Sequence, residues 1–214
     1  MLLTLSNEIE TQGLAKSRVE ALSDGIFAVA MTLLILDIKV PTVARASDLP
    51  HELLALWPRL LSYVISFLML GIYWVGQHNQ FHIIRRADRN LLWINVVFLM
   101  TICGVPFSTA LVSAYLREPV ALAVYGGNLI AIGLILCGHW LYATHRHRLT
   151  DHGLNPRFVR LVTRRILIGP VVFAAATAFA FLSTTIALVI FVLGPVVYFL
   201  PGKIDRHWNT RREA

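Results

Sequence analysis

Charged residues and cysteines are both scarce in this sequence. Only 14% of its 214 residues are Asp, Glu, Lys or Arg, whereas 57% are hydrophobic. A soluble domain of this size carries roughly a quarter charged residues, so the composition excludes a soluble globular domain and indicates a polytopic membrane protein. The two cysteines, Cys103 and Cys137, lie within apolar runs, which is typical of packing residues and not of a disulfide framework.

The motifs that mark enzymes and metal sites are missing as well. The sequence has no phosphate-binding glycine loop and no Ser/His/Asp arrangement in a recognisable context. His145 and His147 lie in an arginine-rich segment without a cysteine or carboxylate in register, so they do not form a metal motif. We therefore expect no enzymatic activity, no bound metal and no cofactor.

Six apolar stretches are predicted to form membrane helices, at about residues 18–38, 58–81, 90–115, 120–144, 166–182 and 186–200. The predicted fold is an all-α integral membrane protein with six transmembrane helices in a single domain, residues 18–200. A polar segment (1–17) precedes this domain and a basic tail (201–214) follows it.

Single residues are expected to set some helix boundaries. Pro58 is placed to begin the second helix, Asn90 to cap the third, and Pro106 to kink it. The longest polar connection is predicted at 145–165, which contains six arginines.

The net charge of +7 is unevenly distributed. Lysines and arginines lie in short segments beside apolar runs, a pattern typical of membrane proteins and not of nucleic-acid-binding proteins. With six spans, fifteen of them fall on the side that holds both ends of the chain, and four (Lys39, Arg45, Arg59 and Arg117) on the other. The excess marks the cytoplasmic side, so we expect a multi-pass plasma-membrane protein with both termini in the cytoplasm. Glu8 and Glu10 argue against a secretory signal peptide at the start.

The first apolar stretch carries polar residues near its beginning. From Arg18 to Ile38 an α-helix would be about 30 Å long, the thickness of the hydrocarbon core of a bilayer. A charge in hydrocarbon costs on the order of 2.5–3.5 kcal/mol, so a buried Asp24 would need a donor, for which Arg18 and His78 are candidates.

This stretch has two distinct faces. At 100° per residue, Leu22, Gly25, Val29, Thr32 and Leu36 form a stripe about 80° wide. Ser23 and Asp24 point away from this stripe. By itself such an apolar stripe is typical of helix packing, and a membrane threonine commonly donates to the carbonyl four residues earlier.

The residues Arg18-x-x-x-Leu22-Ser23-Asp24 resemble the Arg-x-x-x-Phe-Ser-Asp signature that opens the first helix of transmembrane protein 175 potassium channels, specifically their single-repeat prokaryotic members. Leu22 replaces the phenylalanine of the signature. The resemblance continues through Ala28, Thr32, Leu33, Leu34, Leu36, Asp37 and Ile38.

This resemblance implies a potassium-selective cation channel in which the first helix lines the central pore of a homotetramer in the lipid bilayer. K⁺ would be the permeant ion. By position, Val29 would form the apolar constriction, Leu36 the next apolar ring, and Thr32 a hydroxyl ring that contributes to selectivity.

The resemblance also implies a hydrogen-bond network that fixes the first helix against its neighbours. Its members would be Arg18, Ser23, Asp24, Trp74 and His78. The last two lie at the end of the second helix, on the same side of the membrane as the motif.

Val124-Tyr125-Gly126-Gly127 is similar to the TVGYG filter of other potassium channels. It directly follows the turn at Pro119, which leaves no room for the pore helix that such a filter needs. We interpret Gly126 and Gly127 as small residues that permit close helix contact. The predicted channel therefore lacks a TVGYG filter.

Two other functions are compatible with the sequence. A secondary transporter or proton-coupled permease would use Asp24, His78 and Asp37 as a protonation relay, although the fourth helix holds no second copy of the Ser-Asp motif. A membrane scaffold without transport would leave the ionic cluster without a role.

Overall fold

The computed structural model describes residues 2–151 and 153–199, with side-chain surroundings for 16–151 and 153–195. Every regular element in this part of the chain is helical. The elements are α1 (Leu2–Leu33), η1 (Leu34–Asp37), η2 (Ala46–Asp48), α2 (Leu49–Ala55), α3 (Trp57–Ile83), α4 (Arg89–Cys103), α5 (Val105–Ala114), α6 (Pro119–Thr144), η3 (His145–His147), α7 (Pro156–Ala180) and α8 (Thr184–Phe199). The predicted tail, 201–214, lies outside the described residues.

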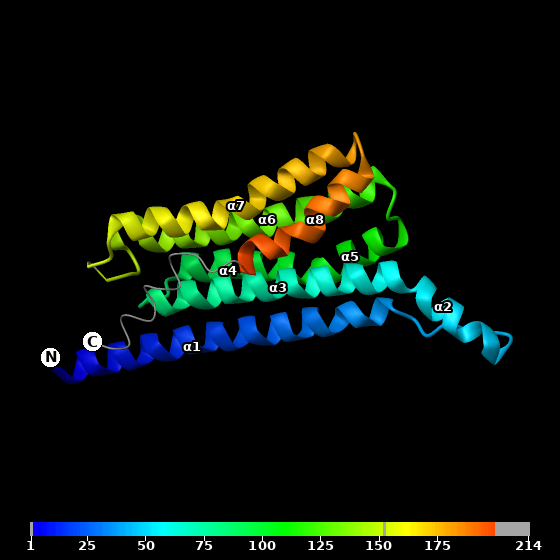
Figure 1. The fold of residues 1–214 in the computed structure, drawn as a ribbon. Helices are drawn as coiled ribbons and strands as arrows, with labels where there is room; N and C mark the ends of the chain where they lie inside the picture. The colour runs from blue at the N-terminus through cyan, green and yellow to red at the C-terminus, as the bar shows by residue number, and fades with distance from the viewer. Residues whose placement is uncertain (1, 152, 200–214) are drawn as a thin grey trace.

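The long helices lie side by side in an elongated bundle (Figure 1). α1 occupies one edge of the bundle and packs on α3, α4 and α5, whereas α7 occupies the opposite edge and packs on α6 and α8. α6 lies between these groups and contributes many of the most buried side chains, among them Leu122, Leu129, Ile132 and Trp140.

Five segments are long and apolar enough to cross a membrane: Lys16–Asp37, Trp57–Ile83, Arg89–Ala114, Pro119–His147 and Pro156–Ala180. They confirm an all-helical membrane protein. The sixth predicted span corresponds to α8, which has 16 residues and is about 24 Å long, less than the hydrocarbon thickness. The sixth span therefore stays a prediction.

Several helix boundaries differ from the predicted ones. α3 begins one residue before Pro58. α4 is capped by Asp88, whose Oδ1 accepts from Leu91 N at 2.9 Å, and not by Asn90, because the helix already begins at Arg89. The kink expected at Pro106 is a break at Gly104 between α4 and α5.

The polar connection predicted at 145–165 is shorter in the structure. α7 begins at Pro156, so four of the six arginines of that segment belong to its first turns. Proline is favourable there because the N–H groups of the first helical residues have no hydrogen-bond acceptor within the helix, so the missing N–H of proline costs nothing. Asn155 caps this end by accepting from Arg157 N at 2.9 Å, and arginine itself is a good helix former.

A further difference concerns the end of the first predicted span. α1 ends at Leu33, and the tighter 3₁₀ turn η1 continues to Asp37. A 3₁₀ turn advances about 120° per residue instead of about 100°. Leu36 is therefore rotated by about 60° relative to the position that an α-helix would give it.

The residues similar to a TVGYG filter lie inside the continuous helix α6, so they form no filter loop. A Cβ on Gly126 would collide with the side chain of Thr177 on α7, whereas nothing lies within 4 Å of a Cβ on Gly127. The close helix contact expected for both glycines is thus present only at Gly126.

Two ion pairs tie the α3–α4 connection to the α6–α7 connection. Arg85 Nε lies 3.0 Å from Asp151 Oδ2, and Arg148 Nε lies 3.4 Å from Asp88 Oδ2. Tyr142 donates its hydroxyl to Asp88 Oδ2 at 2.7 Å, and the Arg148 guanidinium lies over the Tyr142 ring. These contacts join the helix ends on the arginine-rich side.

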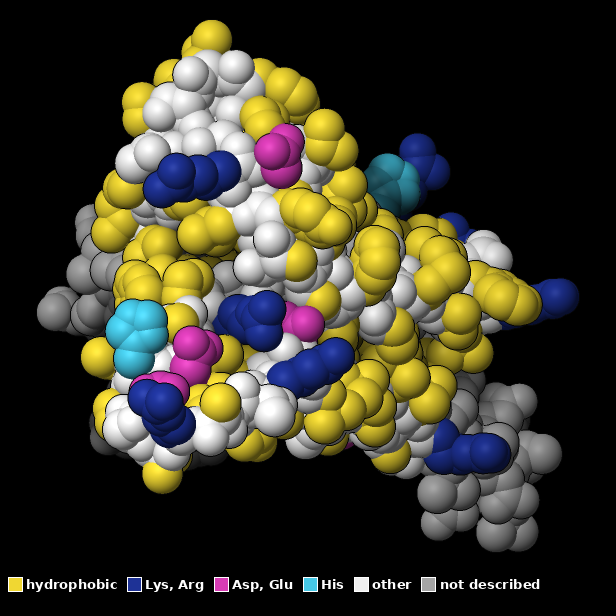
Figure 2. Space-filling model, turned by 90° about the vertical axis from the view of Figure 1, so that its right-hand side faces the viewer, with side chains coloured by type: hydrophobic (Ala, Val, Ile, Leu, Met, Phe, Trp, Pro, Cys, Tyr) yellow, Lys and Arg dark blue, Asp and Glu magenta, His cyan; other side chains and the backbone are white. Residues whose placement is uncertain are grey.

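The opposite end, which carries α2, has a balanced charge. It holds four basic residues and four acidic ones (Asp37, Asp48, Glu52 and Glu118). Figure 2 shows both signs interspersed among hydrophobic side chains at this end. Among the described residues, the excess of positive charge therefore lies on the side of the bundle where the α3–α4 and α6–α7 connections are, with eleven basic and six acidic residues.

Candidate pore face and motif network

One face of α1 is left uncovered by the rest of the chain. Leu22, Val29 and Leu36 have exposed fractions of 53%, 56% and 68%, and Gly25 and Thr32 are also exposed. These are the residues of the predicted stripe. Large apolar side chains on a free surface mark a contact with lipid, with another copy of the chain, or with a narrow pore.

The opposite face of α1 is packed into the bundle. Ser23, Phe27, Ala30 and Leu34 are buried, and the rings of Phe27 and Phe98 lie 6.0 Å apart between centroids. Apolar residues occupy both faces, so burial within the chain, and not polarity, distinguishes them. The orientation of α1 predicted from its helical wheel agrees with this packing.

The hydroxyl of Thr32 is hydrogen-bonded to its own helix. Thr32 Oγ1 lies 2.9 Å from both Ala28 O and Val29 O, and its single proton serves one carbonyl at a time. The oxygen lone pairs are not used by these bonds. Thr32 therefore presents an acceptor oxygen on an otherwise apolar exposed stripe.

Ser23 lies at the centre of a buried polar network. Its hydroxyl donates to Val19 O at 2.9 Å and accepts from Gln77 Nε2 at 3.2 Å and from Asn95 Nδ2 at 3.3 Å. Gln77 Nε2 also donates to Asn95 Oδ1 at 2.6 Å. Three helices, α1, α3 and α4, are joined through these three side chains.

Gln77 and Asn95 were not among the site residues predicted from the sequence. Gln77 lies one residue before His78 in the segment that the sequence singled out, but its burial was not foreseen. Asn95 is a single polar residue within the apolar run of α4. A lone amide in a membrane helix is a signal for a polar partner, although it does not identify that partner.

Asp24 is exposed and not buried as expected. It is bound by Trp74, a predicted member of the network, and not by Arg18 or His78, the two donors considered for it from the sequence. Trp74 Nε1 donates to Asp24 Oδ1 at 2.8 Å, which links α1 to α3. The His78 ring stacks on Trp74 with centroids 5.6 Å apart. Arg18 is exposed, and among the described residues its side chain has neither a hydrogen bond nor an ion pair.

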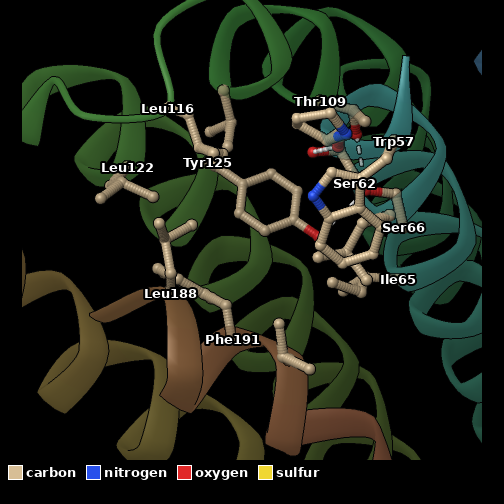
Figure 3. A pocket seen from close by; sticks show the side chains of 14 residues that line it. Trp57, Ser62, Ile65, Ser66, Thr109, Leu116, Leu122, Tyr125, Leu188 and Phe191 are labelled. Carbon is tan, nitrogen blue, oxygen red and sulfur yellow. Dashed lines mark hydrogen bonds between the residues drawn. The ribbon is translucent and has the colours of Figure 1, made fainter. Parts of the chain in front are cut away.

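A half-open cavity of about 100 Å³ lies elsewhere, between α3, α5, α6 and α8. Figure 3 shows Tyr125 and Ser66 pointing toward each other beside it. Their hydroxyls lie 3.0 Å apart, and Thr109 Oγ1 donates to Ser66 Oγ at 2.8 Å. No charged side chain lines the cavity and α1 contributes nothing to it, so it is not a candidate ion path.

Comparison with known proteins assigns the chain to a family. The family model of the endosomal/lysosomal potassium channel TMEM175 matches residues 18–106. A potassium channel of Streptomyces collinus is 40% identical over 80% of this chain and 85% of its own length. A potassium channel of Chamaesiphon minutus is 37% identical over 85% of this chain and 92% of its own length.

Solved structures agree with this assignment. The crystal structure of a lysosomal potassium-selective channel TMEM175 homologue from Chamaesiphon minutus has a TM-score of 0.77 at 32% identity, over 87% of this chain and 97% of that one. A sequence relative, the human endosomal/lysosomal proton channel TMEM175, is 37% identical over half of this chain, which corresponds to 23% of the human protein. The chain therefore belongs to the TMEM175 family of ion channels.

Proposed function

We propose that this protein is a potassium-selective channel of the plasma membrane, formed by four copies of the chain around a central pore lined by α1. The exposed apolar face of α1, from Leu22 through Val29, is the observation that carries the proposal. One helix cannot enclose a pore, so a ring of copies is required. The relatives that match most of this chain are named potassium channels.

Val29 forms the narrow apolar ring in this proposal. A ring of apolar side chains offers water no hydrogen bonds, so a narrow column of water there can dewet and stop ions. Leu36 forms a second apolar ring nearer the end that carries α2. Its rotation in η1 places it off the line of Val29 and Thr32, so we assign the principal constriction to Val29.

Thr32 supplies the selectivity ring. Because its hydroxyl proton is directed to a carbonyl of its own helix, its oxygen is left to accept, which is what a cation requires. Four such oxygens around an axis can replace part of the hydration shell of K⁺. Val29 lies three residues before Thr32, so the two rings follow one another along the same face.

The motif residues hold α1 in the rotation that this pore needs. Ser23 and Asp24 bind α3 and α4 on the side of α1 away from the stripe. Ser23, Asp24 and Trp74 thus act within one chain, with His78 packed on Trp74. We assign Arg18, which is exposed, to a contact between neighbouring copies.

A proton relay is less well supported by the contacts. Asp24 accepts from the Trp74 indole, whose N–H is a donor only and cannot pass a proton on. Asp37 lies 13 residues farther along the chain, about 20 Å away along the helix axis. Among the described residues, Asp24, His78 and Asp37 are therefore not connected to one another by hydrogen bonds.

The orientation follows the charge distribution. The arginine-rich ends of α3, α4, α6 and α7 face the cytoplasm, and the α2 end faces outward. With α8 counted as the sixth span, both termini lie on the cytoplasmic side.

Recording in planar bilayers tests the function. Purified protein under a potassium gradient should give a current whose reversal potential follows the K⁺ equilibrium potential, and sodium substitution should shift that potential. A current that requires a proton gradient, or a flux with fixed stoichiometry, would establish a transporter instead.

A further inference from the structure

α7 presents an exposed face that changes from basic to apolar along its length. Arg157, Arg160 and Arg164 are exposed and lie within about 60° of one another around the helix. The same face continues through Ile168 and Val171, which are 42% and 66% exposed. One surface of the helix therefore begins with three guanidinium groups and continues as hydrocarbon.

The three arginines have no acidic partner on their own helix or the next one. Residues 156–199 contain neither Asp nor Glu, and among the described residues the side chains of these arginines form no ion pair. By contrast, Arg85 and Arg148 in the adjacent connections are paired with Asp151 and Asp88. The charge of the three α7 arginines is therefore available to an external anion.

The position of α7 decides which kind of anion can reach it. α7 and α1 form opposite edges of the bundle (Figure 1). If α1 faces the central axis, as the proposed function requires, then α7 lies at the periphery of the assembly. Its apolar face then meets the acyl chains of the bilayer, and its arginines lie at the level of the headgroups.

We propose that this face of α7 binds an anionic glycerophospholipid, with the headgroup phosphate held by Arg160 and Arg164 and an acyl chain along Ile168 and Val171. Guanidinium groups bind phosphate oxygens in a bidentate manner. From Arg157 to Arg164 the helix rises about 10 Å, comparable to the depth of one headgroup layer and its boundary with the acyl chains. The continuity of the basic and apolar surfaces favours a lipid over a soluble anion.

Native mass spectrometry of the purified protein with equimolar phosphatidylglycerol and phosphatidylcholine tests this inference. The wild type should retain phosphatidylglycerol preferentially, and each arginine removed should lower this preference about fivefold, since a basic residue near an anionic surface contributes about 1 kcal/mol of attraction. The triple variant R157Q/R160Q/R164Q should retain both lipids equally. The single variant R160Q gives an intermediate value and serves if the triple variant does not fold.

A matched control removes the same charge from the other end. R45Q/R59Q/R117Q replaces three exposed arginines and should leave the preference for phosphatidylglycerol intact. Equal loss in the control and in the α7 variant would overturn the site, because general electrostatics would then explain retention. Competition by millimolar glycerol phosphate would also overturn it, in favour of a soluble anion. Lipid retention is read without ion currents, so its failure is distinguishable from the failure of the proposed channel function.

Discussion

Trp74 donates its indole N–H to the carboxylate of Asp24 across the α1–α3 contact, with 2.8 Å between Nε1 and Oδ1. The two residues are fifty positions apart in the chain. A hydrogen bond to a charged acceptor contributes roughly twice as much as a neutral one, so this pair is a strong restraint on the rotation of α1. The face of α1 that lies opposite is the proposed pore face.

Asp24→Asn should loosen this restraint and lower thermal stability in detergent, since the side chain keeps its shape but loses its charge. Trp74→Phe should cost a similar amount by removing the donor. In a double-mutant cycle, the two changes together should cost less than their sum, with a coupling of about 0.5–1 kcal/mol because the contact is exposed. Strictly additive effects would show that the contact contributes nothing.

Ser23→Ala should destabilise the protein by about 1–3 kcal/mol, because Gln77 and Asn95 each lose a buried acceptor. Unfolding in detergent measures this loss. Ser62→Ala is the matched control. The Ser62 hydroxyl donates only to Pro58 O within α3, so its removal should cost less than 1 kcal/mol. An equal loss in the two variants would remove Ser23 from its central place in the network.

Thr32→Ala should reduce the preference for potassium over sodium while leaving a conducting assembly. The change removes the only hydroxyl on the exposed stripe of α1. Reversal potentials in mixed potassium and sodium solutions measure the effect. Thr163→Ala is the control, because Thr163 Oγ1 likewise donates to a carbonyl four residues earlier but lies on α7. An unchanged reversal potential for Thr32→Ala would exclude it from the selectivity ring.

Val29→Asn should raise basal current and reduce selectivity, because polar groups keep a narrow neck hydrated. Val29→Phe should suppress current without affecting assembly. Both are checked by bilayer recording together with size-exclusion chromatography.

Phe27→Leu serves as the control for these two variants. Phe27 is buried against Phe98, so its truncation should lower stability by about 1–3 kcal/mol and leave ion preference as it is. If Phe27 variants alter permeation and Val29 variants do not, α1 faces the axis with its other side.

Cysteines placed at Ser47 and Glu118 should react with a membrane-impermeant thiol reagent added to intact cells, whereas one at Gly153 should react only after lysis. All three positions are exposed, so accessibility depends on the side of the membrane alone. Cys103 is also exposed in the chain and is replaced by Ala in the background. Labelling of Gly153→Cys in intact cells would reverse the orientation.

The sequence alone determined that this is a helical membrane protein, because long apolar runs with few charges have no other stable arrangement across a bilayer. It also determined the positions of four spans to within a few residues, since hydropathy depends only on composition within a short window; the fifth span begins ten residues earlier than predicted. The Ser-Asp motif was sufficient to indicate the family, because it is read residue by residue. Helical periodicity, a local property of the chain, was sufficient to divide α1 into two faces.

Only the tertiary structure decided which side chains the motif residues contact. Asp24 binds Trp74, and Ser23 binds Gln77 and Asn95; these partners lie 50 to 72 positions away, and their proximity depends on how three helices pack. Likewise, the 3₁₀ turn that rotates Leu36 differs from an α-helical turn by a small local free energy, which tertiary packing can override. The faces of α1 are equally apolar, so only packing could show which one the chain leaves exposed.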